Sequence, residues 1–188
     1  MPGNLFVVSG PSGAGKGTLL ARVLQELEGI WLSISATTRT PRRGEQNGKD
    51  YFFLSVEEFQ RLIATDGLLE WAVVHGNYYG TKLSVVTERL DAGIDVVLEI
   101  DPQGAFQIAE KIPTTVLVFI APPSLAILEQ RLRLRGTEDE EALALRLANA
   151  RLELAQRERY TVTIVNDDLA TAAMELRTVF ESYRRTEK

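Results

Sequence analysis

Short runs of apolar residues alternate with stretches of helical periodicity along much of the chain. Residues 4–9 (NLFVVS), 95–100 (DVVLEI) and 115–120 (TVLVFI) are largely apolar and rich in β-branched side chains, as inner strands of a parallel sheet are. Such alternation predicts a three-layer α/β fold around a parallel sheet. The remaining expected elements are a strand at 162–165 and helices at 16–27, 104–111, 125–134, 140–158 and 169–183.

Residues 33–92 interrupt this alternation. A polar, turn-rich stretch, TRTPRRGEQNGKDY, is followed by short strand patterns at 51–54 and 69–74. Between these strands, Ser55 and Glu58 have the spacing of a capping box, which predicts the start of a helix. The segment therefore reads as an insertion with its own small fold.

The chain is long enough for one buried core. We expect that core to comprise residues 1–32 and 93–188, with 33–92 as a small separate lobe. The sequence has no cysteine and no apolar run near the roughly 20 residues of a membrane helix. Its N-terminus also lacks the basic start and long apolar stretch of a signal peptide. These features predict a soluble cytoplasmic protein without membrane association, either a monomer or a homo-oligomer.

The net charge of −5 argues against binding of long nucleic acid through the overall electrostatic field. An anionic ligand would therefore have to meet local basic clusters. A solvated loop or helix face is the alternative interpretation for any such cluster. The basic clusters are Arg39, Arg42 and Arg43 early in the chain, and Arg131, Arg133, Arg135 and Arg146 later.

The glycine-rich stretch GPSGAGKGT lies between the first predicted strand and the first predicted helix. Its glycines allow the backbone to turn so that N–H groups point at an anion, and the following helix adds its positive end. Lys16 would supply a mobile charge for the β- and γ-phosphates of a nucleotide. A glycine-rich turn with an incidental lysine is the alternative. The residues expected to bind ATP here are Gly10, Pro11, Ser12, Gly13, Ala14, Gly15, Lys16, Gly17 and Thr18.

Position 17 departs from the usual loop, which carries Ser or Thr after the Gly-Lys pair. Gly17 removes one hydroxyl that could bind Mg²⁺, but Mg²⁺ keeps several waters and binds largely through substrate phosphates. We expect Mg²⁺ to arrive with ATP, with no strong protein ligand, and Glu99 or Asp101 to contact its water molecules. The same GKGT ending occurs in adenylate kinases, which favours a nucleoside monophosphate kinase.

Several longer motifs closely resemble guanylate kinase, in the right order over nearly the whole chain. They are SISATTRTPRRGEQNGKDYFF, EWAVVHGNYYGT, EIDPQGA, APPS, RLRLRGTE and IVNDDL. The resemblance implies a P-loop kinase core with parallel sheet, an inserted GMP-binding lobe at 33–92 and a helical lid at about 124–155.

By this resemblance, four residues read guanine. Glu70 and Asp101 accept hydrogen bonds from N1–H and N2–H, and the hydroxyls of Ser35 and Thr81 meet O6. Adenine presents the opposite donor and acceptor pattern at this edge, so it would leave these groups unpaired at about 1–3 kcal/mol each. Taken outside the motif, each residue could be an ordinary polar position in a strand.

The resemblance also assigns the GMP phosphate to Arg39 and Arg42 with the Tyr51 and Tyr79 hydroxyls. Arginine suits this role because its guanidinium makes forked contacts that lysine cannot. The two tyrosines could instead serve only in packing. Arg43 matches no role and is expected at the solvated surface.

In the lid, the resemblance brings Arg131, Arg135 and Arg146 to the transferring phosphates. Arg131 and Arg135 are four residues apart and share one helix face, and Gly136 has the character of a helix C-cap. The alternative is an exposed basic face paired with Glu129 or with the acidic run that follows, and Arg133 keeps that interpretation. Asn166 matches a residue near the adenine of ATP. His75, the only histidine, is assigned no chemistry.

The expected reaction transfers the γ-phosphate of MgATP to GMP, giving ADP and GDP. Lys16, Arg39, Arg131, Arg135 and Arg146 would align the phosphates and neutralise their charge. We expect dGMP to react as well, since no assigned residue reads the 2′-hydroxyl. One alternative is a guanylate-kinase-like binding module without catalysis, although such modules typically lack an intact phosphate loop. The second alternative is a kinase for another nucleotide, and the guanine pocket argues against it.

Overall fold

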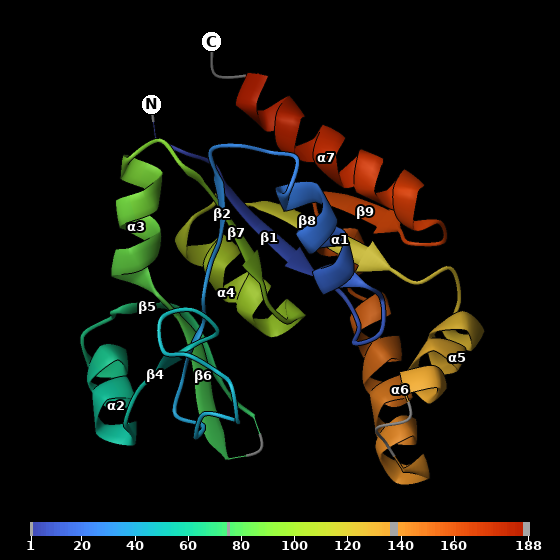
Figure 1. The fold of residues 1–188 in the computed structure, drawn as a ribbon, viewed down its shortest axis with the longest axis horizontal. Helices are drawn as coiled ribbons and strands as arrows, with labels where there is room; N and C mark the ends of the chain where they lie inside the picture. Colours follow the sequence, from blue (N-terminus) through green and yellow to red (C-terminus); the bar gives the residue numbers. More distant parts are fainter. Residues whose placement is uncertain (1, 75, 136–138, 186–188) are drawn as a thin grey trace. The chain divides into compact units, whose positions relative to one another are not determined.

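The computed structural model describes residues 2–74, 76–135 and 139–185. Within these ranges, parallel strands form a five-stranded sheet in the order β2-β7-β1-β8-β9, and a four-stranded sheet has the order β4-β3-β6-β5 (Figure 1). The chain divides into two compact units. Unit 1 comprises Met1–Leu5, Gly29–Leu98 and Gln103–Thr115, and unit 2 comprises Phe6–Glu28, Glu99–Pro102 and Val116–Lys188.

Unit 2 carries most of β1 and the C-terminal half of the fold. The strand β8 is buried along its whole length, as expected for an inner strand of a parallel sheet. The elements of this unit are β1 (Leu5–Ser9), α1 (Lys16–Leu24), β8 (Val116–Ala121), α5 (Leu125–Arg135), α6 (Glu140–Leu154), the 3₁₀ helix η1 (Arg157–Arg159), β9 (Val162–Val165) and α7 (Leu169–Arg185).

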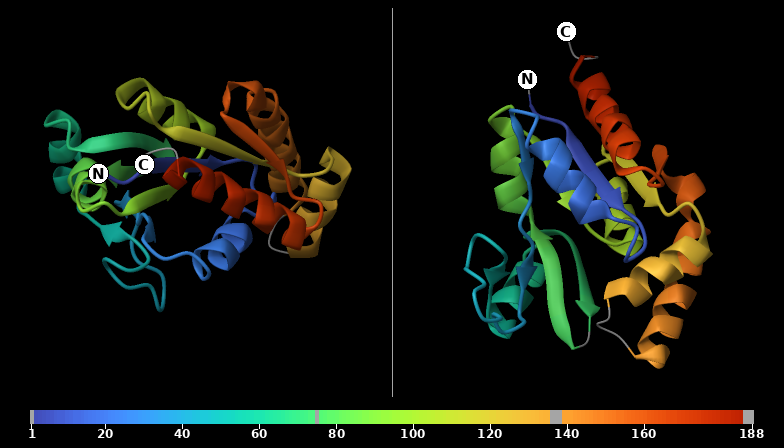
Figure 2. Two further views of the ribbon diagram at one scale, coloured as in Figure 1. Left: turned by 90° about the horizontal axis from the view of Figure 1, so that it is seen from above. Right: turned by 45° about the vertical axis from the view of Figure 1, so that its right-hand side comes forward.

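The two faces of the strands in unit 2 are covered by different helices. Phe6 of β1 packs edge-on against Phe180 of α7, with ring centroids 4.8 Å apart. Ser9 pairs with Phe119 in the sheet, and the Phe119 ring contacts Tyr160, which follows η1, at 4.9 Å. Since Phe6 and Ser9 point to opposite faces of the strand, unit 2 has three layers. Figure 2 shows α1 and α7 on one side and α6 on the other. The predicted three-layer α/β fold is confirmed.

Unit 1 holds the four-stranded sheet and most of the parallel pair β2 and β7. The last residue of β7, Glu99, belongs to unit 2. The helix α2 packs on the four-stranded sheet through Phe59, which is fully buried with Ala36 and Leu68. The predicted capping box is confirmed: the Ser55 hydroxyl accepts from Glu58 N–H, and the Glu58 carboxylate accepts from Ser55 N–H. The elements are β2 (Ile30–Leu32), β3 (Ala36–Thr37), β4 (Phe52–Phe53), α2 (Val56–Ala64), β5 (Leu68–Val74), β6 (Asn77–Lys82), α3 (Leu83–Asp91), β7 (Asp95–Glu99) and α4 (Pro102–Lys111).

Two helices end before the predicted residue. The helix α1 ends at Leu24, three residues before the predicted end. Beyond it, Arg177 of α7 bonds the Glu26 carboxylate at 2.9 Å and Arg184 bonds the Glu28 carbonyl at 2.9 Å. The helix α6 ends at Leu154 and is followed by η1, where a helix to 158 was predicted.

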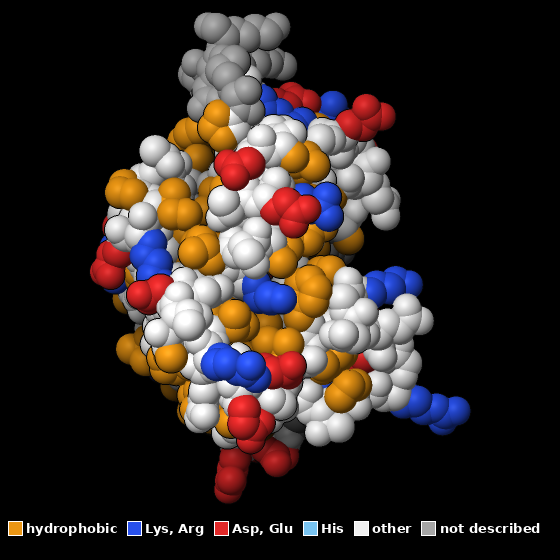
Figure 3. Space-filling view, turned by 90° about the vertical axis from the view of Figure 1, so that its left-hand side faces the viewer, with side chains coloured by type: hydrophobic (Ala, Val, Ile, Leu, Met, Phe, Trp, Pro, Cys, Tyr) orange, Lys and Arg blue, Asp and Glu red, His pale blue; other side chains and the backbone are white. Residues whose placement is uncertain are grey.

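No helix in the described parts of the chain is long and apolar enough to cross a bilayer. The face in Figure 3 carries hydrophobic, basic and acidic side chains intermixed. His75 and Gly136 lie outside the described residues.

Candidate active site

The loop between β1 and α1 has backbone angles that favour glycine. Gly13 and Gly15 have φ of 90° and 91°, in the left-handed region that side chains disfavour. At Gly10, a Cβ atom would lie 2.1 Å from the Ile120 carbonyl oxygen, which leaves no room for a side chain. Gly10, Gly13 and Gly15 are therefore required by the shape of the loop.

Lys16 is the first residue of α1, and Gly15 is its N-cap. The Lys16 ammonium donates to the carbonyl oxygens of Gly10 at 2.5 Å and Pro11 at 3.2 Å, so it folds over the loop. The first turn, KGTL, carries no acidic residue, and the positive end of the helix is not neutralised from within it. Loop, lysine and helix end together suit a polyphosphate.

Side chains from distant parts of the sequence hold this loop. Asn166 Nδ2 donates to the Ala14 carbonyl at 2.7 Å, and Arg146 Nη1 donates to the Ser12 hydroxyl at 2.6 Å. A Cβ atom on Gly13 would lie 2.9–3.0 Å from the Leu128 and Leu132 side chains of α5. The predicted lid helices thus contact the phosphate loop within unit 2.

The lid arginines have different surroundings. Arg131 Nη2 donates to the backbone carbonyl of Asn166 at 2.9 Å. Arg133 is half exposed and pairs with Glu129 and Glu140, which agrees with its expected surface role. The side chain of Arg135 lies outside the described residues.

Acidic side chains lie beside the loop. A Cβ atom on Gly17 would be 3.6 Å from Glu99 Oε2, an ordinary van der Waals distance. Burial raises the pKa of the Glu153 carboxyl, the Lys16 ammonium opposes that rise and Asp101 adds to it. Burial likewise raises the pKa of the Tyr160 hydroxyl to about 12. Sequence reasoning missed Glu153, which stands in a helix among other acidic residues without a motif to mark it.

No cluster of three or more metal-binding side chains exists among the described residues. The carboxylates of Glu99 and Asp101 nevertheless belong to the same unit as the loop, and Glu99 faces the position where the hydroxyl is missing. This donor set fits Mg²⁺ held mainly by phosphate oxygens and water. It does not fit a metal held by protein ligands alone.

In unit 1, three of the residues predicted to read guanine lie in one row across the sheet. Glu70 of β5 pairs with Thr81 of β6, and Ala36 of β3 pairs with Gly80. Continued by one residue, the second register puts Ser35 opposite Thr81. Glu70 and Thr81 are 6% and 1% exposed, and the Thr81 hydroxyl donates to Glu70 Oε1 at 2.6 Å.

The alternation of β6 explains its unusual sequence, NYYGTK. Thr81 and Tyr79 point to the face of this row, while Tyr78 and Gly80 point to the α2 side. Tyr78 stacks on Phe59, with ring centroids 5.2 Å apart. A Cβ atom on Gly80 would lie 3.1 Å from the Phe59 ring and 2.6 Å from the Glu70 carbonyl. Glycine at this position therefore lets the strand lie close to α2 and β5.

The residues predicted for the GMP phosphate gather near Arg39. Its guanidinium lies 5.3 Å from the centre of the Tyr51 ring. The pKa of Arg39 is raised mainly by Glu45, with a smaller contribution from Tyr79. The Tyr51 and Tyr79 rings are 6.3 Å apart. The structure thus brings together three of the four predicted phosphate ligands.

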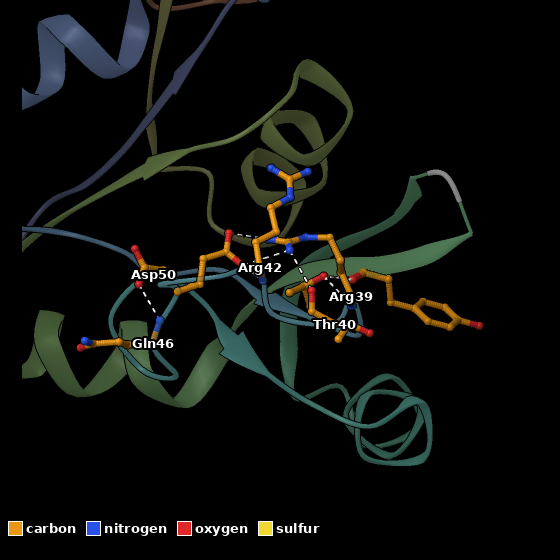
Figure 4. A network of polar contacts seen from close by, with 8 residues as sticks. Arg39, Thr40, Arg42, Gln46 and Asp50 are labelled. Atoms are coloured by element: carbon orange, nitrogen blue, oxygen red, sulfur yellow. Dashed lines mark hydrogen bonds and ion pairs between the residues drawn. The ribbon is translucent and has the colours of Figure 1, made fainter. Parts of the chain in front are cut away.

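Glu45, which sequence reasoning missed, is the main partner of Arg39. Two hydrogen bonds of 2.8 and 3.0 Å join the guanidinium to the carboxylate, and Arg42 N–H donates to the same carboxylate at 2.6 Å. This pairing raises the pKa of Arg39 and lowers that of Glu45. Figure 4 shows the Arg42 side chain extending away from this network. An acidic residue two places after the arginine cluster was the available sign.

Comparison with known proteins agrees with the motifs. A family model described as guanylate kinase matches residues 2–183. A guanylate kinase of Gloeobacter violaceus is 56% identical, covering 89% of this chain and 82% of its own. One from a Synechococcus species is 52% identical, covering 90% of each chain.

Solved structures agree at the level of the fold. The crystal structure of guanylate kinase from Anaplasma phagocytophilum has a TM-score of 0.77 and 34% identity, covering 98% of this chain and 87% of that one. Shikimate kinase from Bacteroides thetaiotaomicron, at TM-score 0.50 and 15% identity, covers 95% of this chain and 98% of its own and shares the fold alone. With a family model spanning almost its whole length and relatives about half identical to it, the chain belongs to the guanylate kinase family.

Proposed function

We propose that this member of the family transfers the γ-phosphate of ATP to GMP and to dGMP. The observation that carries the choice of acceptor is the buried pair of Glu70 and Thr81, joined at 2.6 Å. A buried carboxylate costs free energy unless its acceptors are used. Guanine, with donors at both N1 and N2, uses them, and adenine does not.

On the ATP side, the phosphates bind to backbone N–H groups of the loop at residues 12–18 and to the Lys16 ammonium. Arg146, which bonds Ser12 of the loop, and Arg131 belong to the segment at about 124–155 that we propose as the lid. Their charge offsets the negative charge that spreads over the transferred group. Arg135 is assigned to the same task by family resemblance alone.

Magnesium fits this site as a companion of ATP, with Glu99 and Asp101 binding its water molecules. When bound, it would neutralise phosphate charge. The chain's own contribution is to orient the phosphates through the loop and to offer carboxylates on the Gly17 side.

On the GMP side, residues 33–92 form the proposed binding lobe, which lies wholly in unit 1. Ser35 and Glu70 read the guanine edge, and Asp101 is kept as a second acceptor by resemblance. Arg39 and Arg42 bind the phosphate with Tyr51 and Tyr79. The Thr81 hydroxyl has one proton, which goes to Glu70 in this structure. Thr81 therefore supports the guanine site through Glu70, which it holds in place.

A coupled assay of ADP release across nucleoside monophosphates tests the proposal. With MgATP, GMP and dGMP are expected to react at least about 10²-fold better in kcat/KM than AMP, CMP or UMP, since two or more unpaired buried groups oppose the wrong base. Equal rates with AMP would overturn the guanine assignment. Absence of turnover with every acceptor would favour a binding module.

Replacing Gly17 with serine is expected to change the magnesium dependence more than GMP binding. The distance of 3.6 Å to Glu99 leaves room for the side chain, and its hydroxyl adds a possible ligand. The Mg²⁺ concentration for half-maximal rate should fall about threefold, the factor of one modest polar contact. Titration of Mg²⁺ at fixed ATP, with Gly17→Ala as the control lacking a hydroxyl, measures this. A shift in KM for GMP with an unchanged Mg²⁺ profile would contradict it.

A further inference from the structure

Asn166 is the residue at which three elements of unit 2 meet. It directly follows β9 and is 5% exposed. Its backbone N–H donates to the Ala121 carbonyl at the end of β8 at 2.8 Å, and its own carbonyl accepts from Arg131 of α5 at 2.9 Å. Its side chain donates to the Ala14 carbonyl of the phosphate loop at 2.7 Å.

The chemistry of the loop fixes which way the Asn166 amide points. The Ala14 oxygen is a carbonyl and can only accept, so the group facing it must be the NH₂. The same NH₂ nitrogen lies so close to Gly15 that a Cβ atom there would approach it to 2.4 Å. The amide thus rests directly against the peptide that joins Ala14 and Gly15.

We propose that Asn166 is a positioning residue, which acts on ATP through the shape of the phosphate loop and does not read adenine. In a trans peptide the carbonyl and the next N–H point in opposite directions. Holding the Ala14 carbonyl toward Asn166 therefore aims the Gly15 N–H away from it, toward the anion. The inference rests on the proposed function only in taking this loop as the ATP phosphate site.

A comparison of ligands with and without adenine distinguishes this role from adenine recognition. A residue that shapes the loop affects every polyphosphate equally, whereas a residue that contacts adenine affects only adenine nucleotides. The probe is therefore tripolyphosphate with Mg²⁺, compared with ATP under the same conditions. Calorimetry gives the Kd of each without any need for turnover.

In the Asn166→Ala protein, we expect the Kd values of both ATP and tripolyphosphate to rise about tenfold, since the Ala14 carbonyl loses its partner. In steady-state kinetics, KM for ATP should rise while KM for GMP stays within about twofold, the range of a surface substitution. Weaker ATP binding with unchanged tripolyphosphate binding would overturn the proposal in favour of an adenine contact. Unchanged binding of both would overturn it outright.

A second variant shows whether the effect of Asn166→Ala comes from the lost donor or from the lost side-chain volume. Asn166→Asp keeps the size of the side chain but removes its donor, and combining it with Asp167→Asn keeps the net charge. Asp167→Asn alone is the matched control, because Asp167 is exposed, and it should leave both Kd values unchanged. A double variant without a melting transition would assign Asn166 to folding, which also overturns the proposal. Failure of the proposed function would appear separately, as absent GMP turnover in the unaltered protein.

Discussion

Replacing Lys16 with methionine is expected to lower kcat by about 10³-fold, the scale on which a single charge at a transferring phosphate acts. Methionine keeps the length of the apolar stem and removes the ammonium. The ammonium bonds the loop carbonyl oxygens of Gly10 and Pro11. KM for GMP should change by less than about threefold, the factor of a minor contact.

The matched control is Arg151→Met, which removes one positive charge from an exposed position of α6 in the same unit. It should leave kcat unchanged. Rapid-quench measurement of a single turnover separates the chemical step from product release. A Lys16→Met protein with a normal melting temperature and a normal rate of transfer would remove Lys16 from the proposed mechanism.

The loop was predictable because its requirements are local. A buried strand, spaced glycines, a lysine and a helix are contiguous in the sequence, and each has one physical reason to be there. The inner strands β7 and β8 were equally easy to predict, because burial on both faces gives an uninterrupted apolar run. The capping box of α2 needed only Ser55 and Glu58.

Elements that form mainly because of tertiary contacts were not predicted. The strand β3 has two residues, too few to show any period. The strand β6, NYYGTK, contains residues that disfavour strands, and it forms because β3 and β5 pair with its two edges. The helix α3 has no side-chain cap and buries only Val86 among its residues. In each case tertiary contacts outweigh local preference.

The same division holds within the candidate site. Family motifs named Arg39, Thr81 and Asn166, but their partners depend on the fold. Asn166 meets Ala14 across 152 positions of sequence, and Arg146 meets Ser12 across 134. The Thr81 hydroxyl has one hydrogen and several possible acceptors, so motif matching alone could not show that it donates to Glu70.

Replacing Glu70 with glutamine is expected to lower kcat/KM for GMP by about 10²-fold or more, because an acceptor oxygen facing guanine N–H groups becomes a donor. The two side chains have nearly the same volume, so the packing of the buried row is kept. The lower kcat/KM should appear mainly as a higher KM for GMP, since guanine recognition is present before and during transfer. The KM for ATP should not change, because Glu70 belongs to the unit without the phosphate loop.

Two variants of Thr81 show whether the carboxylate acts as the hydrogen bond suggests. Thr81→Ser retains the hydroxyl that bonds Glu70, and it should keep kcat/KM for GMP within about threefold of the unaltered value, the factor of one lost methyl group. Thr81→Val removes the hydroxyl while keeping the shape, and it should lose about tenfold or more by releasing the carboxylate. The Glu70→Gln and Thr81→Val losses should not add in the double variant, since both disturb one contact. Additive losses would mean that Thr81 binds guanine independently of Glu70.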